Sequence, residues 1–188
     1  MKPWLKAASA LFGIGAVALT LTAASRASKS SSAAAPPRRS RIALIGDSYA
    51  VGLGPELAKL LPDFRFEGHV GTTTSQWAHH DRACGQCGDW LTSFAPDVVL
   101  VSLGVNDDGA ANATNYQEIV RALHGIGARV VWIEPPANVT VNAASVRRII
   151  ASLGVATVPA TQTALSSDGV HPRSYAAWAR EVAGHVVA

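Results

Sequence analysis

Short apolar runs recur along the chain from residue 41 onward, and longer amphipathic stretches separate them. The clearest run, DVVLVSL at residues 97–103, is rich in Val and Leu, follows Pro96 and ends before Gly104. Such a run has no polar face and is typical of a strand buried on both sides. Helices between strands of this kind cover both faces of a parallel sheet. The pattern therefore predicts an α/β fold, a three-layer α/β/α sandwich around a central parallel sheet of about five strands.

The same reading gives the bounds of the other elements. Strands are expected at residues 41–46, 65–70, 97–103, 129–133 and 154–158, and helices at residues 55–61, 116–123, 143–153 and 174–187. In an open parallel sheet, ligands bind beyond the carboxyl ends of the strands. The residues that directly follow each strand are therefore the first candidates for a functional site.

The first forty residues differ from the rest in composition. Two lysines precede an apolar run at residues 7–24, and small residues follow it, which is the pattern of a secretory signal peptide. The run is about as long as a membrane span, so a retained N-terminal anchor is the alternative. We expect residues 1–27 to be the signal or anchor, residues 28–40 a flexible linker, and residues 41–188 the domain. Either reading places the domain outside the cytoplasm, secreted, periplasmic or at the cell envelope.

The formal charge of +3 is concentrated in this N-terminal part. Six of the 16 Lys and Arg residues precede residue 41 and none of the 13 acidic residues does, so residues 41–188 carry a net charge of −3. Nucleic-acid binding requires clustered cations, and those of the domain are scattered. Nucleic acid is therefore excluded as an expected partner. A membrane would be contacted only through the N-terminal anchor, and we expect a monomer.

Four short segments carry polar side chains that suit nucleophilic catalysis. They are GDSY at 46–49, GTTT at 71–74, GVND at 104–107 and DGVHP at 168–172. The first three each follow an expected strand, and the fourth lies between the last strand and the last helix. Because the carboxyl ends of parallel strands meet at one edge of a sheet, we expect these segments to lie together.

The residue types in these segments fit an acyl-transfer site. A serine hydroxyl is a weak nucleophile until a base accepts its proton, and His171 can act as that base for Ser48. Asp168 can hold the imidazole in one tautomer and stabilise its protonated form. The N–H groups of Ser48 and Gly71 and the side-chain amide of Asn106 can stabilise a developing oxyanion.

In this order, the four segments resemble the four motif blocks of the SGNH (GDSL-type) serine hydrolases. The resemblance spans essentially all of residues 41–188 and implies a flavodoxin-like sandwich with esterase, lipase or acyl-carbohydrate esterase chemistry and no cofactor. It implies that Ser48 is the nucleophile, that Asp168 and His171 complete the triad, and that Ser48, Gly71 and Asn106 form the oxyanion hole. In the second block, Gly68 is the alternative to Gly71.

We therefore expect an exported serine esterase that hydrolyses acyl or acetyl esters through an acyl-enzyme intermediate. Its substrate would be an ester-bearing small molecule, lipid or polysaccharide. An O-acyltransferase with the same triad and a non-catalytic cell-envelope or carbohydrate-binding module are the alternatives. Tyr49, which stands where the GDSL motif has Leu, and Trp77 are candidate substrate-binding residues because aromatic rings stack on sugars and acyl groups.

Cys84 and Cys87 are the only cysteines in the sequence. Two thiolates at this spacing, together with His79 or His80, have the ligand types of a zinc site. In an exported protein, however, a pair of cysteines is normally oxidised. We therefore expect a Cys84–Cys87 disulfide and no metal.

Overall fold

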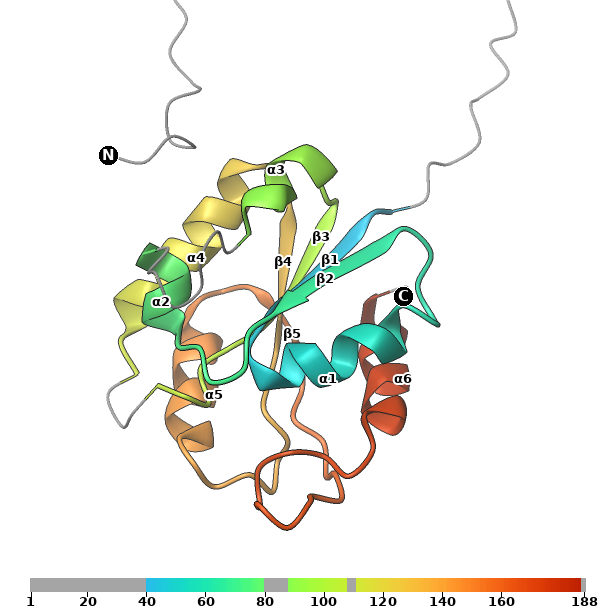
Figure 1. Cartoon of the computed structure of the whole chain (residues 1–188). Coiled ribbons are helices and arrows are strands. Elements are labelled where there is room, and N and C mark those ends of the chain that lie inside the picture. Colours follow the sequence, from blue (N-terminus) through green and yellow to red (C-terminus); the bar gives the residue numbers. More distant parts are fainter. Residues whose placement is uncertain (1–39, 80–87, 108–110, 187–188) are drawn as a thin grey trace, which may run out of the picture. The chain divides into compact units, whose positions relative to one another are not determined.

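The computed structural model describes residues 40–79, 88–107 and 111–186, which form a five-stranded sheet with helices on both faces (Figure 1). The elements, in chain order, are β1 (Ile42–Gly46), α1 (Ser48–Leu57), β2 (Phe64–Gly68), α2 (Thr74–His79), α3 (Asp89–Phe94), β3 (Val98–Ser102), α4 (Ala113–Gly125), β4 (Arg129–Ile133), α5 (Ala143–Ser152), β5 (Ala156–Val158) and α6 (Tyr175–Val186). All neighbouring strands pair in parallel, in the order β2-β1-β3-β4-β5. The predicted α/β sandwich is confirmed.

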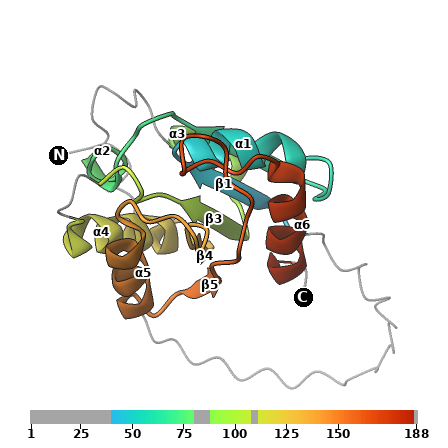
Figure 2. The same cartoon turned by 90° about the horizontal axis from the view of Figure 1, so that it is seen from below.

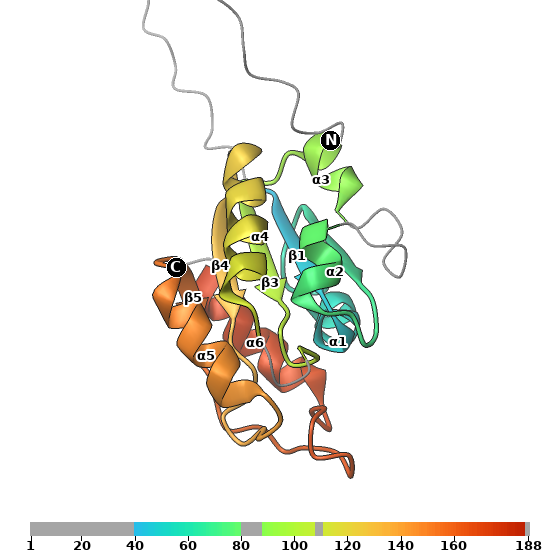
Figure 3. The ribbon, with the colours of Figure 1, turned by 90° about the vertical axis from the view of Figure 1, so that its left-hand side faces the viewer.

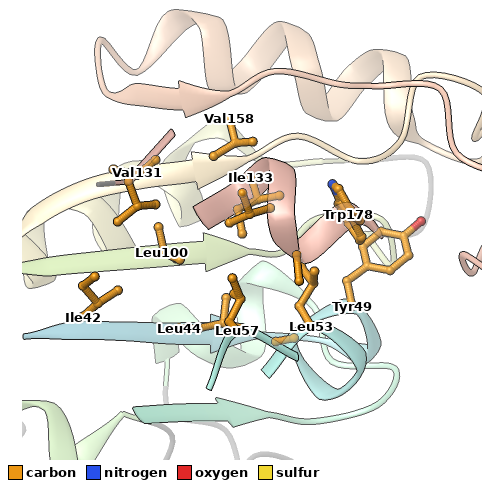
Figure 4. Packing of buried hydrophobic residues seen from close by; sticks show 14 of the residues in the cluster. Ile42, Leu44, Tyr49, Leu53, Leu57, Leu100, Val131, Ile133, Val158 and Trp178 are labelled. Carbon is orange, nitrogen blue, oxygen red and sulfur yellow. The ribbon is translucent and has the colours of Figure 1, made fainter. Parts of the chain in front are cut away.

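Alternate residues of the central strands point to opposite faces and build two cores. Ile42, Leu44 and Leu100 pack against α1 and α6, and Figure 4 shows this core at close range. Ala43 and Val99, one residue further along their strands, pack against α2 to α5 on the other face. Figures 2 and 3 show the two helical layers with the sheet between them. The central strands β1 and β3 are therefore buried on both faces, which explains their continuous apolar runs in the sequence.

Helix α1 begins earlier than the sequence pattern indicated. The expected helix started at Pro55, but the observed helix starts at Ser48 and contains Pro55 near its end. The Asp47 side chain accepts a hydrogen bond from the Tyr49 N–H at 2.9 Å and so caps the helix start. Pro55 costs one hydrogen bond to the carbonyl four residues earlier, and its place in the last turn limits this cost. The nucleophile candidate thus stands on the first turn of a helix rather than in a loop.

The short helices α2 and α3 were not predicted, because six residues are too few to show a helical period. In the described ranges, no helix has the length and hydropathy needed to cross a bilayer. The predicted signal or anchor, and all of the predicted linker except its last residue, lie outside these ranges.

Candidate active site

Ser48 lies at the topological switch point of the sheet, the place where open parallel sheets bind ligands. Strand β1 connects outward to β2, and the chain then crosses back to β3 on the other side of β1, so the two crossovers diverge at the end of β1. The Asp47 N–H donates to the Ser102 carbonyl of β3 at 3.0 Å. A side chain at Gly46 would bring its Cβ to 2.2 Å from the same carbonyl oxygen, so only glycine fits there. The end of β1 is therefore pinned to β3, and Ser48 follows at the carboxyl edge.

A continuous hydrogen-bonded chain links Ser48, His171 and Asp168. The Ser48 Oγ lies 2.8 Å from His171 Nε2, and His171 Nδ1 lies 2.7 Å from Asp168 Oδ2. An ionised Asp168 requires the proton on Nδ1, which leaves Nε2 free to accept the serine proton. The structure thus brings together the three residues proposed from the sequence: Ser48 as nucleophile, His171 as base and Asp168 as the carboxylate that orients the base.

The loop that carries Asp168 keeps its carboxylate ionised. Besides His171, the N–H groups of Val170 and His171, each at 2.9 Å, and the Ser166 hydroxyl at 2.8 Å donate to this carboxylate. These hydrogen bonds, first that of the His171 side chain and then those of the backbone, hold the pKa of Asp168 well below its usual value. An ionised Asp168 therefore accepts the Nδ1 proton of neutral His171 and fixes its tautomer.

On the other side of Ser48 lie the groups expected to bind an oxyanion. As the first residue of α1, Ser48 has an N–H without a carbonyl partner inside the helix. The Asn106 side-chain amide donates to the Thr72 carbonyl at 3.1 Å and makes a longer contact of 3.4 Å with Asp47 Oδ2. Thr72 directly follows Gly71, so the GTTT and GVND loops lie side by side.

The two candidate glycines of the second block differ in their surroundings. Gly71 is exposed and has φ +75°, a left-handed conformation that favours glycine. Gly68 ends β2, where an added Cβ would lie 2.7 Å from the Val51 amide nitrogen of α1. Close packing against α1 explains Gly68, and Gly71 remains the candidate oxyanion-hole residue.

No family model matches the sequence, and no curated protein matches it. Solved structures do match. An acetyl xylan esterase is 17% identical, covers 78% of this chain and 99% of its own, and superposes with a TM-score of 0.56. The catalytic domain of peptidoglycan O-acetyltransferase A from Streptococcus pneumoniae is 20% identical, with coverage of 79% and 91% and a TM-score of 0.53. A protein described as a GDSL-like lipase from Bacteroides uniformis is 13% identical, with coverage of 79% and 96% and a TM-score of 0.57.

The domain has the SGNH hydrolase fold. At these identities the likeness concerns the fold, and the site must be judged from its own residues.

In this SGNH fold, a buried layer of polar groups lies under the site. The Asp107 carboxylate accepts the Thr74 N–H at 2.8 Å and the Thr74 hydroxyl at 2.7 Å. This pair ties the start of α2 to the GVND loop and so holds the GTTT and GVND loops together.

Asp47 is the second buried carboxyl group of this layer. It has no exposed surface, and burial is the main cause that raises its pKa to about 7. The negative charge of Asp107 adds to this rise, while the hydrogen bond from the Tyr49 N–H opposes it. No catalytic or binding role was expected for Asp47, Asp107 or Thr74 from the sequence. The acidic residues inside GDSY and GVND were the available signal, but only the tertiary structure shows what they contact.

Tyr49 and Trp77 were expected to bind substrate, and the structure corrects this. Their side chains are buried, with 2% and 5% exposed. The Tyr49 hydroxyl donates to the Val170 carbonyl at 3.1 Å, and the Trp77 indole N–H donates to the Thr72 hydroxyl at 3.2 Å. Because Tyr49 lies on the core face of α1 and Trp77 on that of α2, neither ring is available to stack on a substrate.

Cys84, Cys87 and His80 lie outside the described residues, so their disulfide or metal chemistry stays a prediction. His79 is described, and its Nδ1 lies 3.7 Å from a carboxylate oxygen of Glu118. Within the part of the chain that the structure describes, no three potential metal ligands cluster.

Proposed function

We propose that this protein is a serine esterase that hydrolyses acyl or acetyl esters through an acyl-enzyme on Ser48. The observation that carries the proposal is the unbroken chain of hydrogen bonds from Ser48 through His171 to Asp168 at the carboxyl edge of the sheet. The SGNH fold supports it, since acetyl xylan esterases and other esterases share that fold.

The geometry supports a two-step mechanism. His171 Nε2 accepts the Ser48 proton while Oγ attacks the ester carbonyl. The resulting oxyanion would be stabilised by the Ser48 and Gly71 N–H groups and by the Asn106 amide. Protonated His171 then gives its proton to the leaving alcohol, and the acyl group stays on Oγ. In the second step, water attacks the acyl carbonyl with His171 as base, and Ser48 recovers its proton from His171 as the carboxylic acid leaves.

A set of aryl esters of increasing acyl length tests this function with the purified full-length protein. We expect hydrolysis by the parent protein and a loss of about 10⁶ in kcat in Ser48→Ala, because only the attacking oxygen is removed. Ser152→Ala is a matched control, since among the described residues its exposed hydroxyl donates only to the Ile149 carbonyl of its own helix. Hydrolysis that is absent from the parent, or retained in Ser48→Ala, would contradict the proposal.

An O-acyltransferase is the second candidate, and the structural match to peptidoglycan O-acetyltransferase A favours it. The same acyl-enzyme would then pass its acyl group to a sugar hydroxyl instead of water. Adding saccharide acceptors to the aryl ester assay separates the two functions. A transferase forms acylated saccharide at the expense of free acid, whereas an esterase forms free acid at an unchanged rate.

We also propose that the protein is exported, with the apolar run at residues 7–24 as the signal or anchor. The two preceding lysines and the small residues that follow support export. Cell fractionation followed by intact-mass measurement tests the proposal. Cleavage near residue 27 indicates a signal peptide, an intact chain in the membrane fraction indicates an anchor, and an intact chain in the cytoplasm contradicts export.

A further inference from the structure

Tyr49 directly follows the nucleophile, and the mechanism so far leaves it without a role. Its ring is buried between α1 and α6 and meets the Trp178 ring edge-on, with centroids 5.3 Å apart (Figure 4). On another side it lies edge-on to the imidazole of His171, at 5.8 Å and 75° between the planes. A single side chain thus touches both the core and the general base. The leucine of the GDSL motif fills space at this position but has no hydroxyl.

The hydroxyl of Tyr49 reaches the loop that carries the base. It donates to the Val170 carbonyl, one residue before His171, at 3.1 Å. Burial, and after it the charge of Asp47, raise the pKa of Tyr49 well above its usual value. The hydroxyl therefore keeps its proton, and remains a donor, throughout the pH range in which an esterase works.

The Asp168–His171 loop is held mainly by bonds within itself. Leu165 and Pro172 form an antiparallel bridge, and the Ser166 N–H donates to the His171 carbonyl at 2.7 Å. Among the described residues, two hydrogen bonds join residues 165–172 to α1, the Ser48–His171 bond and the Tyr49–Val170 bond. The Ser48–His171 bond changes during the proposed reaction, whereas the Tyr49–Val170 bond takes no part in it.

The difference matters when Ser48 carries an acyl group. An esterified Oγ has no proton to donate, so the Ser48–His171 hydrogen bond is absent in the acyl-enzyme. Of the two hydrogen bonds to α1, only the Tyr49–Val170 bond then remains. At this stage His171 must accept a proton from water and return it to Ser48 Oγ.

We propose that Tyr49 is a positioning residue whose hydroxyl holds the His171 loop in place during hydrolysis of the acyl-enzyme. The inference rests on the proposed esterase function and predicts which step depends on the hydroxyl. Acylation starts from a state in which Ser48 itself bonds to His171, so it depends less on Tyr49. Deacylation lacks that bond and depends on Tyr49 more.

Tyr49→Phe tests the proposal because it keeps the buried ring and removes only the hydroxyl. A hydrogen bond of this kind corresponds to about a 2- to 13-fold effect on the step that it supports. We expect kcat for aryl acetates to fall by about this factor, and kcat/KM, which reports acylation, by less than about 2-fold. KM should fall with kcat, and a burst of aryl alcohol should precede the steady state.

Tyr175→Phe is the matched control. Tyr175 lies at the start of α6 with its ring beside Trp178, and its hydroxyl makes no hydrogen bond among the described residues. This variant should keep the parent's kcat and KM. It also shows whether the loss of any tyrosine hydroxyl from the α1–α6 interface slows turnover.

The decay of the acetyl-enzyme, followed by mass spectrometry, gives the deciding rate. Decay is a first-order process, so its rate constant does not depend on the fraction of a variant that is folded. Slower decay in Tyr49→Phe with parental decay in Tyr175→Phe supports the proposal. Decay within about 2-fold of the parent in Tyr49→Phe, or equal slowing in both variants, overturns it. If the parent forms no acetyl-enzyme at all, it is the esterase function itself that fails.

Discussion

Two aspartates lie close to Ser48, and their surroundings are opposite. Asp168 belongs to a surface loop, and its side chain is 49% exposed, whereas Asp47 lies between β1 and α1 with no exposed surface. Hydrogen bonds hold the pKa of Asp168 well below its usual value, and burial raises that of Asp47 to about 7. The same residue type thus has a lowered pKa on one side of Ser48 and a raised pKa on the other.

This contrast explains how the work of the site is divided. A carboxylate that orients a catalytic imidazole must stay ionised, and the four hydrogen-bond donors around Asp168 ensure this. A carboxyl group that caps α1 and contacts Asn106 needs a fixed position more than it needs a charge. Burial between β1 and α1 supplies that fixed position. Proximity to the nucleophile therefore does not make Asp47 part of the triad.

Replacing each aspartate by asparagine separates the two roles most strongly. Asp168→Asn should lower kcat/KM by about 10³ to 10⁴, because His171 loses the charge that fixes its tautomer. Asp47→Asn should cost about 10-fold or less, since asparagine can still cap the helix. Aryl ester kinetics on both variants measure the difference. Equal losses would mean that Asp47 takes part in the chemistry.

Asn106→Ala tests the oxyanion side of the site, where Asp47 contributes only through its contact with the Asn106 amide. We expect kcat to fall by about 10² to 10³ with a smaller change in KM, because the amide binds the oxyanion more strongly than the ground-state carbonyl. Steady-state kinetics across a range of ester concentrations separate the two constants. A raised KM beside an unchanged kcat would make Asn106 a substrate-binding residue.

The pH dependence of stability should show the contrast in the folded protein itself. Burial raises the pKa of Asp47 from 3.8 to about 7, so between these values the folded state keeps a proton that the unfolded state has lost. The Asp47 contribution to the free energy of unfolding is therefore complete below pH 4 and is lost as the pH rises to about 7. Asp168, with its lowered pKa, has the opposite sign, and its contribution is lost only as the pH falls below the usual carboxyl range.

Urea unfolding at pH 5 and pH 8, for the parent and Asp47→Asn, measures this effect. The parent should lose up to a few kcal/mol more than the variant over this interval. An equal pH dependence in the parent and Asp47→Asn would show that Asp47 does not titrate in this range.

The sequence predicted most of the sheet and the meeting of Ser48, His171 and Asp168, because both depend on local signals. Apolar runs locate the strands, and a parallel sheet brings the residues after them to one edge, so Ser48 and His171 meet although they are 123 positions apart. The burial of Tyr49 was missed because it depends on α1 beginning at Ser48, and the pattern placed that start at Pro55. The Asp107–Thr74 contact was missed because it joins two loops 33 positions apart whose packing leaves no periodic trace.

The most direct test of the account is the isolation of the acyl-enzyme itself. The parent protein, mixed with an aryl acetate and quenched in acid within the first turnover, should gain the mass of one acetyl group, and peptide mapping should place it on Ser48. Ser48→Ala should gain none, and His171→Ala should acylate far more slowly. An acetyl group on another residue, or equal acetylation of Ser48→Ala, would contradict the claim that Ser48 is a nucleophile activated by His171.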